Sequence, residues 1–124
     1  PITFFEILTA CYFYKAADYP DNINLIESGL FYRLDSSNVL KSNLASVVTA
    51  ISEDHLDWLP ENDRTIKRII FEKTSSLLNS NIIVAKQRDT KTIECIKKTI
   101  SENISNKFFF NEDFSFTDED NGNW

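Results

Sequence analysis

The sequence predicts an all-α fold, a compact single-domain bundle of about five to seven helices with an acidic C-terminal tail. The chain has 124 residues, which fits one domain that buries a core without disulfides or metals. It contains only two glycines and three prolines, too few for the many tight turns of a sandwich or barrel. Apolar residues recur at helical spacing along most of the chain. We divide it into a helical domain, residues 1–107, and an aromatic and acidic segment, residues 108–124.

The first predicted helix begins at Thr3. Thr3 and Glu6 form a capping-box pattern, in which each side chain accepts a hydrogen bond from the backbone amide of the other residue. This helix is expected to end near Ala17, because the residue before Pro20 disfavours helical backbone angles. A second helix is expected over residues 22–33, where apolar side chains lie near one helix face.

The next two predicted helices form the middle of the chain. The third is capped by Ser36 or Ser37, and residues 40–51 give it the clearest apolar stripe in the sequence. The fourth is capped by Asn62 or Asp63 and ends before the next apolar run. Both would bury one face against the rest of the bundle.

The run Ile82–Ala85 is ambiguous, because four apolar residues fit either a short strand or a continued helix. No partner strand is evident, so a helix or an irregular buried segment is favoured over a strand. A last helix is expected to begin at Asp89 or Thr90. Its inward-facing residues are expected to be Ile93, Ile96, Ile100 and Ile104.

Charge is distributed unevenly along the chain. Residues 1–63 carry ten acids and three bases, residues 64–107 carry four acids and ten bases, and residues 108–124 carry five acids. The net charge is −6 and the pI is about 4.7, so general binding of nucleic acid is not expected, and basic proteins are the natural partners. Nucleic-acid binding through residues 64–107 remains an alternative, although four acids interrupt that region.

Two stretches combine acidic and aromatic residues, a mixture typical of protein interfaces, in which an apolar anchor is surrounded by charges that steer the partner. Alternatively, Trp58 packs in the core while the acids around it solvate a loop, and the second stretch is an ordinary solvated terminus. The predicted partner-binding residues are Glu53, Asp54, Asp57, Trp58 and Glu61, followed by Asp113, Asp118, Glu119 and Asp120.

No catalytic constellation is visible, and we expect no enzymatic activity, no cofactor and no metal. His55 is the only histidine, and it lies far in sequence from Cys11 and Cys95, so an exposed or capping histidine is expected. The cysteines match no zinc or redox motif and are interpreted as thiols in a reducing compartment, with a disulfide as the alternative. Gly29 and Gly122 alone cannot form a glycine-rich phosphate loop. An enzyme of unrecognised type remains a further alternative.

No signal peptide and no apolar run of about 20 residues is present, so we expect a cytoplasmic protein without a membrane partner. Small size, acidity, helical pattern and lack of catalytic motifs resemble the immunity proteins of bacterial toxin systems, of the contact-dependent growth inhibition or colicin type. The resemblance implies that the chain neutralises a cognate toxin, typically a basic nuclease domain, by covering its active cleft. The alternative is an acidic helical adaptor or regulatory protein, of phage origin, that binds a host protein.

Overall fold

The computed structural model describes residues 1–116 and shows a mixed α/β fold. The prediction of an all-α bundle is therefore wrong. Two short 3₁₀ turns, Leu56–Trp58 and Glu61–Asp63, lie between the first strand and the second helix. The helices and strands are α1 (Phe4–Ala16), β1 (Ala45–Val48), α2 (Ile66–Thr74), β2 (Asn81–Val84), α3 (Thr90–Thr99) and β3 (Lys107–Phe109).

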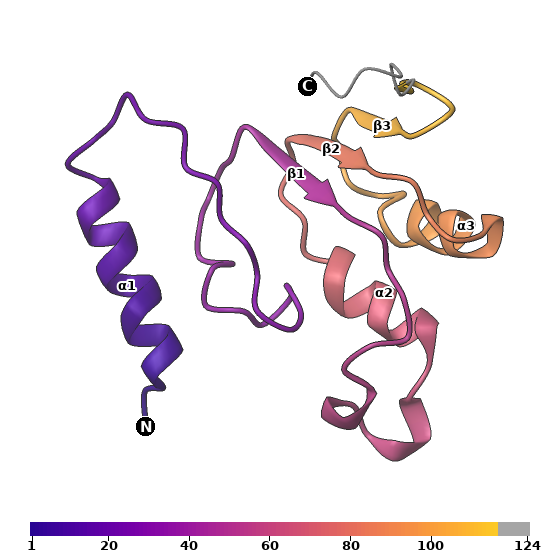
Figure 1. The fold of residues 1–124 in the computed structure, drawn as a ribbon, viewed down its shortest axis with the longest axis horizontal. Helices are drawn as coiled ribbons and strands as arrows, with labels where there is room; N and C mark the ends of the chain where they lie inside the picture. Colours follow the sequence, from indigo (N-terminus) through magenta and orange to yellow (C-terminus); the bar gives the residue numbers. More distant parts are fainter. Residues whose placement is uncertain (117–124) are drawn as a thin grey trace, which may run out of the picture.

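The three strands form a parallel sheet in the order β1-β2-β3. Helix α2 connects β1 to β2, and α3 connects β2 to β3, so the chain from residue 45 to residue 109 consists of two consecutive βαβ units. Both helices lie on the same side of the sheet (Figure 1). The core between the helices and the sheet contains Val48, Ile51, Leu59, Ile69, Ile70, Ile82, Val84, Ile96, Ile100 and Phe109.

Short apolar runs explain why β1 was mistaken for part of a helix and why a strand was not favoured at β2. A strand of a parallel sheet is often apolar on both faces, so its sequence shows no clear period of two. A run of only four such residues therefore looks the same as part of a buried helix. The apolar stripe of residues 40–51 does not form one buried face, because Leu44 and Val47 are exposed while Val48 and Ile51 are buried. Three residues of the run Ile82–Ala85 lie in β2, so the strand alternative was the right one there.

The predicted helix starts at both ends of the chain are confirmed. In α1 the Glu6 amide donates to Thr3 Oγ1 at 3.2 Å, and the Thr3 amide donates to Glu6 Oε2 at 2.6 Å, which completes the capping box. Asp89 caps α3 by accepting a 2.8 Å hydrogen bond from the Thr92 amide, and this bond lowers the pKa of the Asp89 carboxyl. Helix α2 begins later than predicted, with Thr65 as its cap.

The predicted helix over residues 22–33 is wrong, since the structure shows no helix there. The backbone amides of Tyr32 and Arg33 donate instead to the backbone oxygen of Glu72, at 3.2 and 2.9 Å. A helix would have used these amides internally, so contact with α2 has replaced local hydrogen bonding. Ile104, predicted to face inward, is 89% exposed, because α3 ends at Thr99.

The division into residues 1–107 and 108–124 stays a prediction, although β3 includes residues on both sides of it. Phe110 and Phe114 form an isolated parallel bridge just beyond this strand. The acidic tail expected from residue 118 onward lies outside the described residues. None of the helices within residues 1–116 has the length and apolar character needed to cross a membrane.

Candidate functional site

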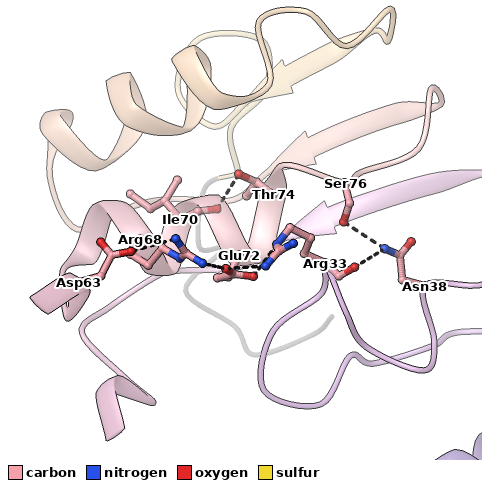
Figure 2. A network of polar contacts seen from close by, with 8 residues as sticks. All are labelled: Arg33, Asn38, Asp63, Arg68, Ile70, Glu72, Thr74 and Ser76. Atoms are coloured by element: carbon pink, nitrogen blue, oxygen red, sulfur yellow. Dashed lines mark hydrogen bonds and ion pairs between the residues drawn. The ribbon is translucent and has the colours of Figure 1, made fainter. Parts of the chain in front are cut away.

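Four charged side chains form a connected network along α2 (Figure 2). The Arg33 guanidinium binds Glu72 through two hydrogen bonds, Nε to Oε2 at 2.8 Å and Nη2 to Oε1 at 3.0 Å. Arg68 also contacts Glu72, with Nη2 at 2.6 Å from Oε1, while its Nη1 lies 2.8 Å from Asp63 Oδ2. We call Arg33, Asp63, Arg68 and Glu72 the α2 charge network.

Glu72 is the centre of this network and is only 5% exposed. A buried carboxylate is costly unless it is paired and hydrogen-bonded, and two guanidinium groups supply both kinds of compensation here. The hydrogen bond from Arg33 is the main reason that the pKa of Glu72 is lowered, and Arg68 adds to the effect against the opposing effect of burial. The same hydrogen bond raises the pKa of Arg33, so the pair is fully ionised at neutral pH.

We expect the contribution of Glu72 to stability to depend on pH. Its folded-state pKa lies below its unfolded value, so the stabilisation is complete above the unfolded pKa and is lost as pH falls through the folded one. The Glu72→Gln variant should therefore lose more unfolding free energy at pH 7 than at about pH 3, below the ordinary glutamate pKa of about 4.3. Urea unfolding of wild type and variant at both pH values measures this difference.

The matched control is Glu94→Gln on the exposed face of α3, which should cost little at either pH. An equal cost of Glu72→Gln at both pH values would contradict the assignment of an ionised, paired Glu72.

The segment of residues 29–38, which we call the 29–38 loop, is held against the C-terminal half of α2. Besides the bonds of Tyr32 and Arg33 to Glu72, Asn38 Nδ2 donates to Arg33 O and to Ser76 Oγ, both at 3.1 Å (Figure 2). The side chain and the backbone oxygen of Glu72 thus both accept hydrogen bonds from the same loop residue, Arg33. The α2 charge network therefore fixes the position of a loop that is distant in sequence.

A second group of side chains lies beside the network, around the ring of Phe31. Lys73 Nζ is 5.8 Å from the ring centroid and donates to Leu30 O at 3.1 Å. The His55 ring meets the Phe31 ring edge-on, with centroids 6.0 Å apart, and its Nε2 lies 3.3 Å from Asp54 Oδ2. We call Phe31, His55 and Lys73 the Phe31 cluster, which brings an imidazole and an ammonium group to one aromatic surface.

Neither cysteine is part of this cluster. Cys11 is exposed on α1 and Cys95 is half-buried on α3, and both are free thiols, so the disulfide alternative is wrong. His55 adopts left-handed backbone angles (φ 57°) at the start of the turn Leu56–Trp58, where its side chain makes no capping hydrogen bond. Within residues 1–116, no group of three or more histidine, cysteine or acidic side chains is arranged to hold a metal ion.

The first predicted binding stretch lies in the loop between β1 and α2. Glu53, Asp57 and Glu61 are exposed there, and Asp54 contacts His55. Trp58 is 71% exposed, so it does not pack in the core. The stretch is available to a partner, but its role in binding one stays a prediction.

The second predicted stretch is not brought together with the first. Asp113 accepts a 2.7 Å hydrogen bond from the Phe109 amide at the end of β3, which lies at the opposite end of the fold from the loop that carries Trp58 (Figure 1). Asp118, Glu119 and Asp120 lie outside the described residues. A protein partner, and the absence of nucleic-acid and membrane partners, stay predictions.

Sequence reasoning missed the residues that form the α2 charge network. The spacing of Arg68 and Glu72, four residues apart on one helix, was a usable signal for an ion pair. No local signal could identify Arg33, which lies 39 residues before Glu72. Only the fold brings it to α2.

The buried side chain of Gln87 links the segments that follow β1 and β2 at the carboxyl edge of the sheet. Its Oε1 accepts from the Ile51 amide at 3.0 Å, and its Nε2 donates to Thr49 O at 3.1 Å and to Ala85 O at 2.8 Å. Open α/β sheets bind ligands outside this edge. A cavity of about 90 Å³ lies there, lined by Val84, Ala85, Lys86, Gln87, Ile93, Phe109, Phe110 and Asn111.

Comparison with known proteins shows what this chain is similar to. No protein-family model matches the chain. Over 96 residues it is 34% identical to the dihydrofolate synthase/folylpolyglutamate synthase of Bacillus subtilis, a match that covers 77% of this chain and 21% of the relative. The enzyme of the same name from Buchnera aphidicola is 31% identical over 113 residues, covering 88% of this chain and 26% of the relative. The chain is similar to one part of these synthases.

Solved structures give the same result for the fold. The apo form of L. casei FPGS superposes with a TM-score of 0.80 at 23% identity, over 93% of this chain and 27% of that one. Mycobacterium tuberculosis folylpolyglutamate synthase superposes with a TM-score of 0.78 at 25% identity, over 94% and 26%. The chain thus spans about a quarter of the length of the synthases that it matches.

These matches overturn four predictions. The resemblance to toxin immunity proteins is wrong, because the similar proteins are synthases and share the parallel α/β fold. The prediction of a toxin-neutralising function is wrong for the same reason, as is that of an acidic adaptor. The expectation of no enzymatic activity is contradicted as well, since the relatives are enzymes. Size, acidity and missing motifs were not specific enough to distinguish an immunity protein from a chain that is similar to part of a synthase.

Proposed function

We propose that this chain is part of an ATP-dependent ligase of the dihydrofolate synthase/folylpolyglutamate synthase type, which joins glutamate to a folate. The observation that carries the proposal is the similarity to the Bacillus subtilis enzyme over 77% of the chain, together with the shared fold. Solved relatives are described as complexes with AMPPCP, with ADP, and with AMPPCP and folate. We accordingly propose a nucleotide and a folate as the ligands of the complete enzyme.

In this proposal the chain forms part of the domain that binds the nucleotide, and its role is to hold other residues of that domain in position. Its parallel strands end at the edge where α/β proteins bind ligands, and the buried Gln87 fixes that edge. The α2 charge network fixes the 29–38 loop and, through it, Phe31 with its neighbours His55 and Lys73. Gly29 and Gly122 are the only glycines, so we assign the phosphate-binding loop that ATP requires to polypeptide outside this segment.

The reaction balances as an amide synthesis. A carboxylate of the folate and the amino group of glutamate form the new amide bond, ATP is cleaved to ADP, the carboxylate oxygen that is lost leaves as part of the phosphate, and the amine releases its displaced protons to solvent. We propose the cytoplasm as the compartment, which fits two free thiols in the described chain and relatives that use ATP.

A chimeric enzyme tests the function. The matched 96-residue stretch of the Bacillus subtilis synthase is replaced by the corresponding stretch of this chain. We expect the chimera to form glutamylated folate when ATP, folate and glutamate are all present, and no product when ATP is omitted. The matched control is the same chimera carrying Ile82→Ala, which should lose activity together with its fold, because Ile82 lies in the core of the sheet.

Failure of a well-folded chimera to bind nucleotide or to ligate glutamate would contradict the proposed function. Folding is checked separately by circular dichroism and thermal unfolding of the same preparation.

A further inference from the structure

A polar cavity of about 330 Å³ lies at the amino edge of the sheet, where the chain enters its three parallel strands. Its walls come from the residues just before β1, the residues around the start of β2 and the residues just before β3. We call it the amino-edge cavity. The carboxyl edge with Gln87 lies at the other end of the same strands. A ligand bound in this cavity is therefore independent of the proposed function.

Four asparagines line the amino-edge cavity, and three of them join the segments that enter the strands. Asn106 Nδ2 donates to Asn81 Oδ1 at 3.2 Å, and Asn81 Nδ2 donates to Leu44 O at 3.4 Å. Asn79 Oδ1 accepts from the Ile104 amide at 3.3 Å. Within residues 1–116, the Asn79 side-chain nitrogen and Asn106 Oδ1 make no hydrogen bond, so one donor and one acceptor are available to a ligand.

Two buried polar atoms in the wall have no hydrogen-bond partner among residues 1–116. They are Asn43 Oδ1 and Ser80 Oγ. The orientation of the Asn43 amide is fixed, because its Nδ2 donates to Ala45 O at 3.1 Å and to Ser46 Oγ at 2.9 Å, and a carbonyl oxygen accepts only. Buried polar atoms are costly unless they are paired, so these two indicate a site that receives hydrogen bonds from a bound molecule.

The other side chains of the wall restrict the chemistry of that molecule. Among the described residues, neither a charged nor an aromatic side chain lines the cavity. An ionised ligand would find no opposite charge, and a nucleobase would find no ring on which to stack. A purely apolar ligand would leave Asn43 Oδ1 and Ser80 Oγ unpaired. The neighbouring cation, Lys107, donates through Nζ to Asn103 O at 2.6 Å, so its ammonium group is bound to backbone oxygen.

We propose that the amino-edge cavity binds a neutral cyclic polyhydroxy compound, a monosaccharide or a cyclitol. Each hydroxyl both donates and accepts, so neighbouring hydroxyls of one ring donate to Asn43 Oδ1 and accept from the Asn79 side chain, while Ser80 Oγ does either. The C–H surface of the ring packs on Leu44 and Ile104, whose side chains are 73% and 89% exposed. A cavity of this volume suits a small ligand, and we expect a dissociation constant on the order of 1 mM.

Amide chemical shifts of the ¹⁵N-labelled 124-residue chain, titrated with D-glucose or with myo-inositol, test the proposal. We expect at least one of the two to give saturable shifts confined to residues 43–46, 79–82 and 104–107. The compound that binds more tightly shows whether the site prefers a sugar or a cyclitol. Saturation is the decisive property, because polyhydroxy compounds also stabilise proteins by exclusion from the surface, an effect without a saturable site.

The Ser80→Ala variant separates binding from folding. Ser80 Oγ has no partner within residues 1–116, so its removal should leave the thermal midpoint unchanged or slightly higher. Binding should weaken by about fivefold, the loss expected for one hydrogen bond. The matched control is Ser52→Ala, an exposed serine in the loop after β1, which should change neither property. Glucuronate, a sugar ring with an added carboxylate, should bind at least about fivefold more weakly than glucose.

Absence of saturable shifts with both compounds, or saturable shifts outside the three segments, would overturn the proposal. Equal affinity of Ser80→Ala and the wild-type chain would overturn it as well, because the unpartnered hydroxyl would then take no part in binding. Binding of glucuronate as tight as that of glucose would contradict a neutral ligand. The activity of the chimera enters none of these measurements, so a failure here and a failure of the proposed function are distinguishable.

Discussion

Replacing Glu72 by alanine is expected to lower the free energy of unfolding by about 3 kcal/mol, because it leaves two arginines without their shared carboxylate. The side chains of Arg33 and Arg68 are each about one-third exposed, so water can solvate them after the carboxylate is removed. The expected loss of unfolding free energy therefore lies at the low end of the range for a broken buried ion pair. The 29–38 loop should also loosen, because Arg33 loses both side-chain bonds to α2.

Urea unfolding measures the stability change, and hydrogen exchange at the amides of Tyr32 and Arg33 measures the loosening of the loop. Glu94→Ala is the matched control, since it removes an exposed glutamate from α3 and should change stability by less than about 0.5 kcal/mol. If Glu72→Ala and Glu94→Ala had the same small effect, the α2 charge network would not hold the loop.

Replacing Ile82 by alanine is expected to cost about 3 to 4 kcal/mol. Ile82 lies in the central strand, is fully buried, and belongs to the core between the sheet and its helices. The substitution removes three carbons from a packed site, which adds the cost of a cavity to the lost burial. For a domain with a small core, this is a large part of its total stability.

The same measurement on Ile104→Ala provides the control, because Ile104 is also an isoleucine but is 89% exposed. We expect almost no change in the urea midpoint for this variant. Comparable losses for both variants would contradict a central, buried β2.

The sequence predicted the elements whose signals are local. The capping box of Thr3 and Glu6 and the cap at Asp89 depend on residues three positions apart, and the structure confirms both. The sheet depends on pairing between strands that are 25 or more residues apart in the chain, as between Ile82 and Lys107. A run of four apolar residues contains no information about that pairing, so the strands were missed.

The same limit applies to the candidate site. Asp54 was noticed because it stands in an unusually acidic stretch and His55 because it is the only histidine, but the cluster of His55 with Phe31 was not predicted. Lys73 and Phe31 reach that cluster only because the 29–38 loop packs on α2, a contact between segments that are far apart in sequence. Charge patterning favoured a steering surface for a protein partner, whereas similarity to known enzymes was needed to indicate a ligase.

The measurement that most directly tests this account is the mass of the folate after incubation with the chimera, ATP and glutamate. We predict that the folate gains one or more glutamate residues, that ADP accumulates with it, and that neither product forms without ATP. A correctly folded chimera that leaves the mass of the folate unchanged, alongside an active parent synthase, would contradict our central proposal that this chain is a segment of a folate-glutamate ligase.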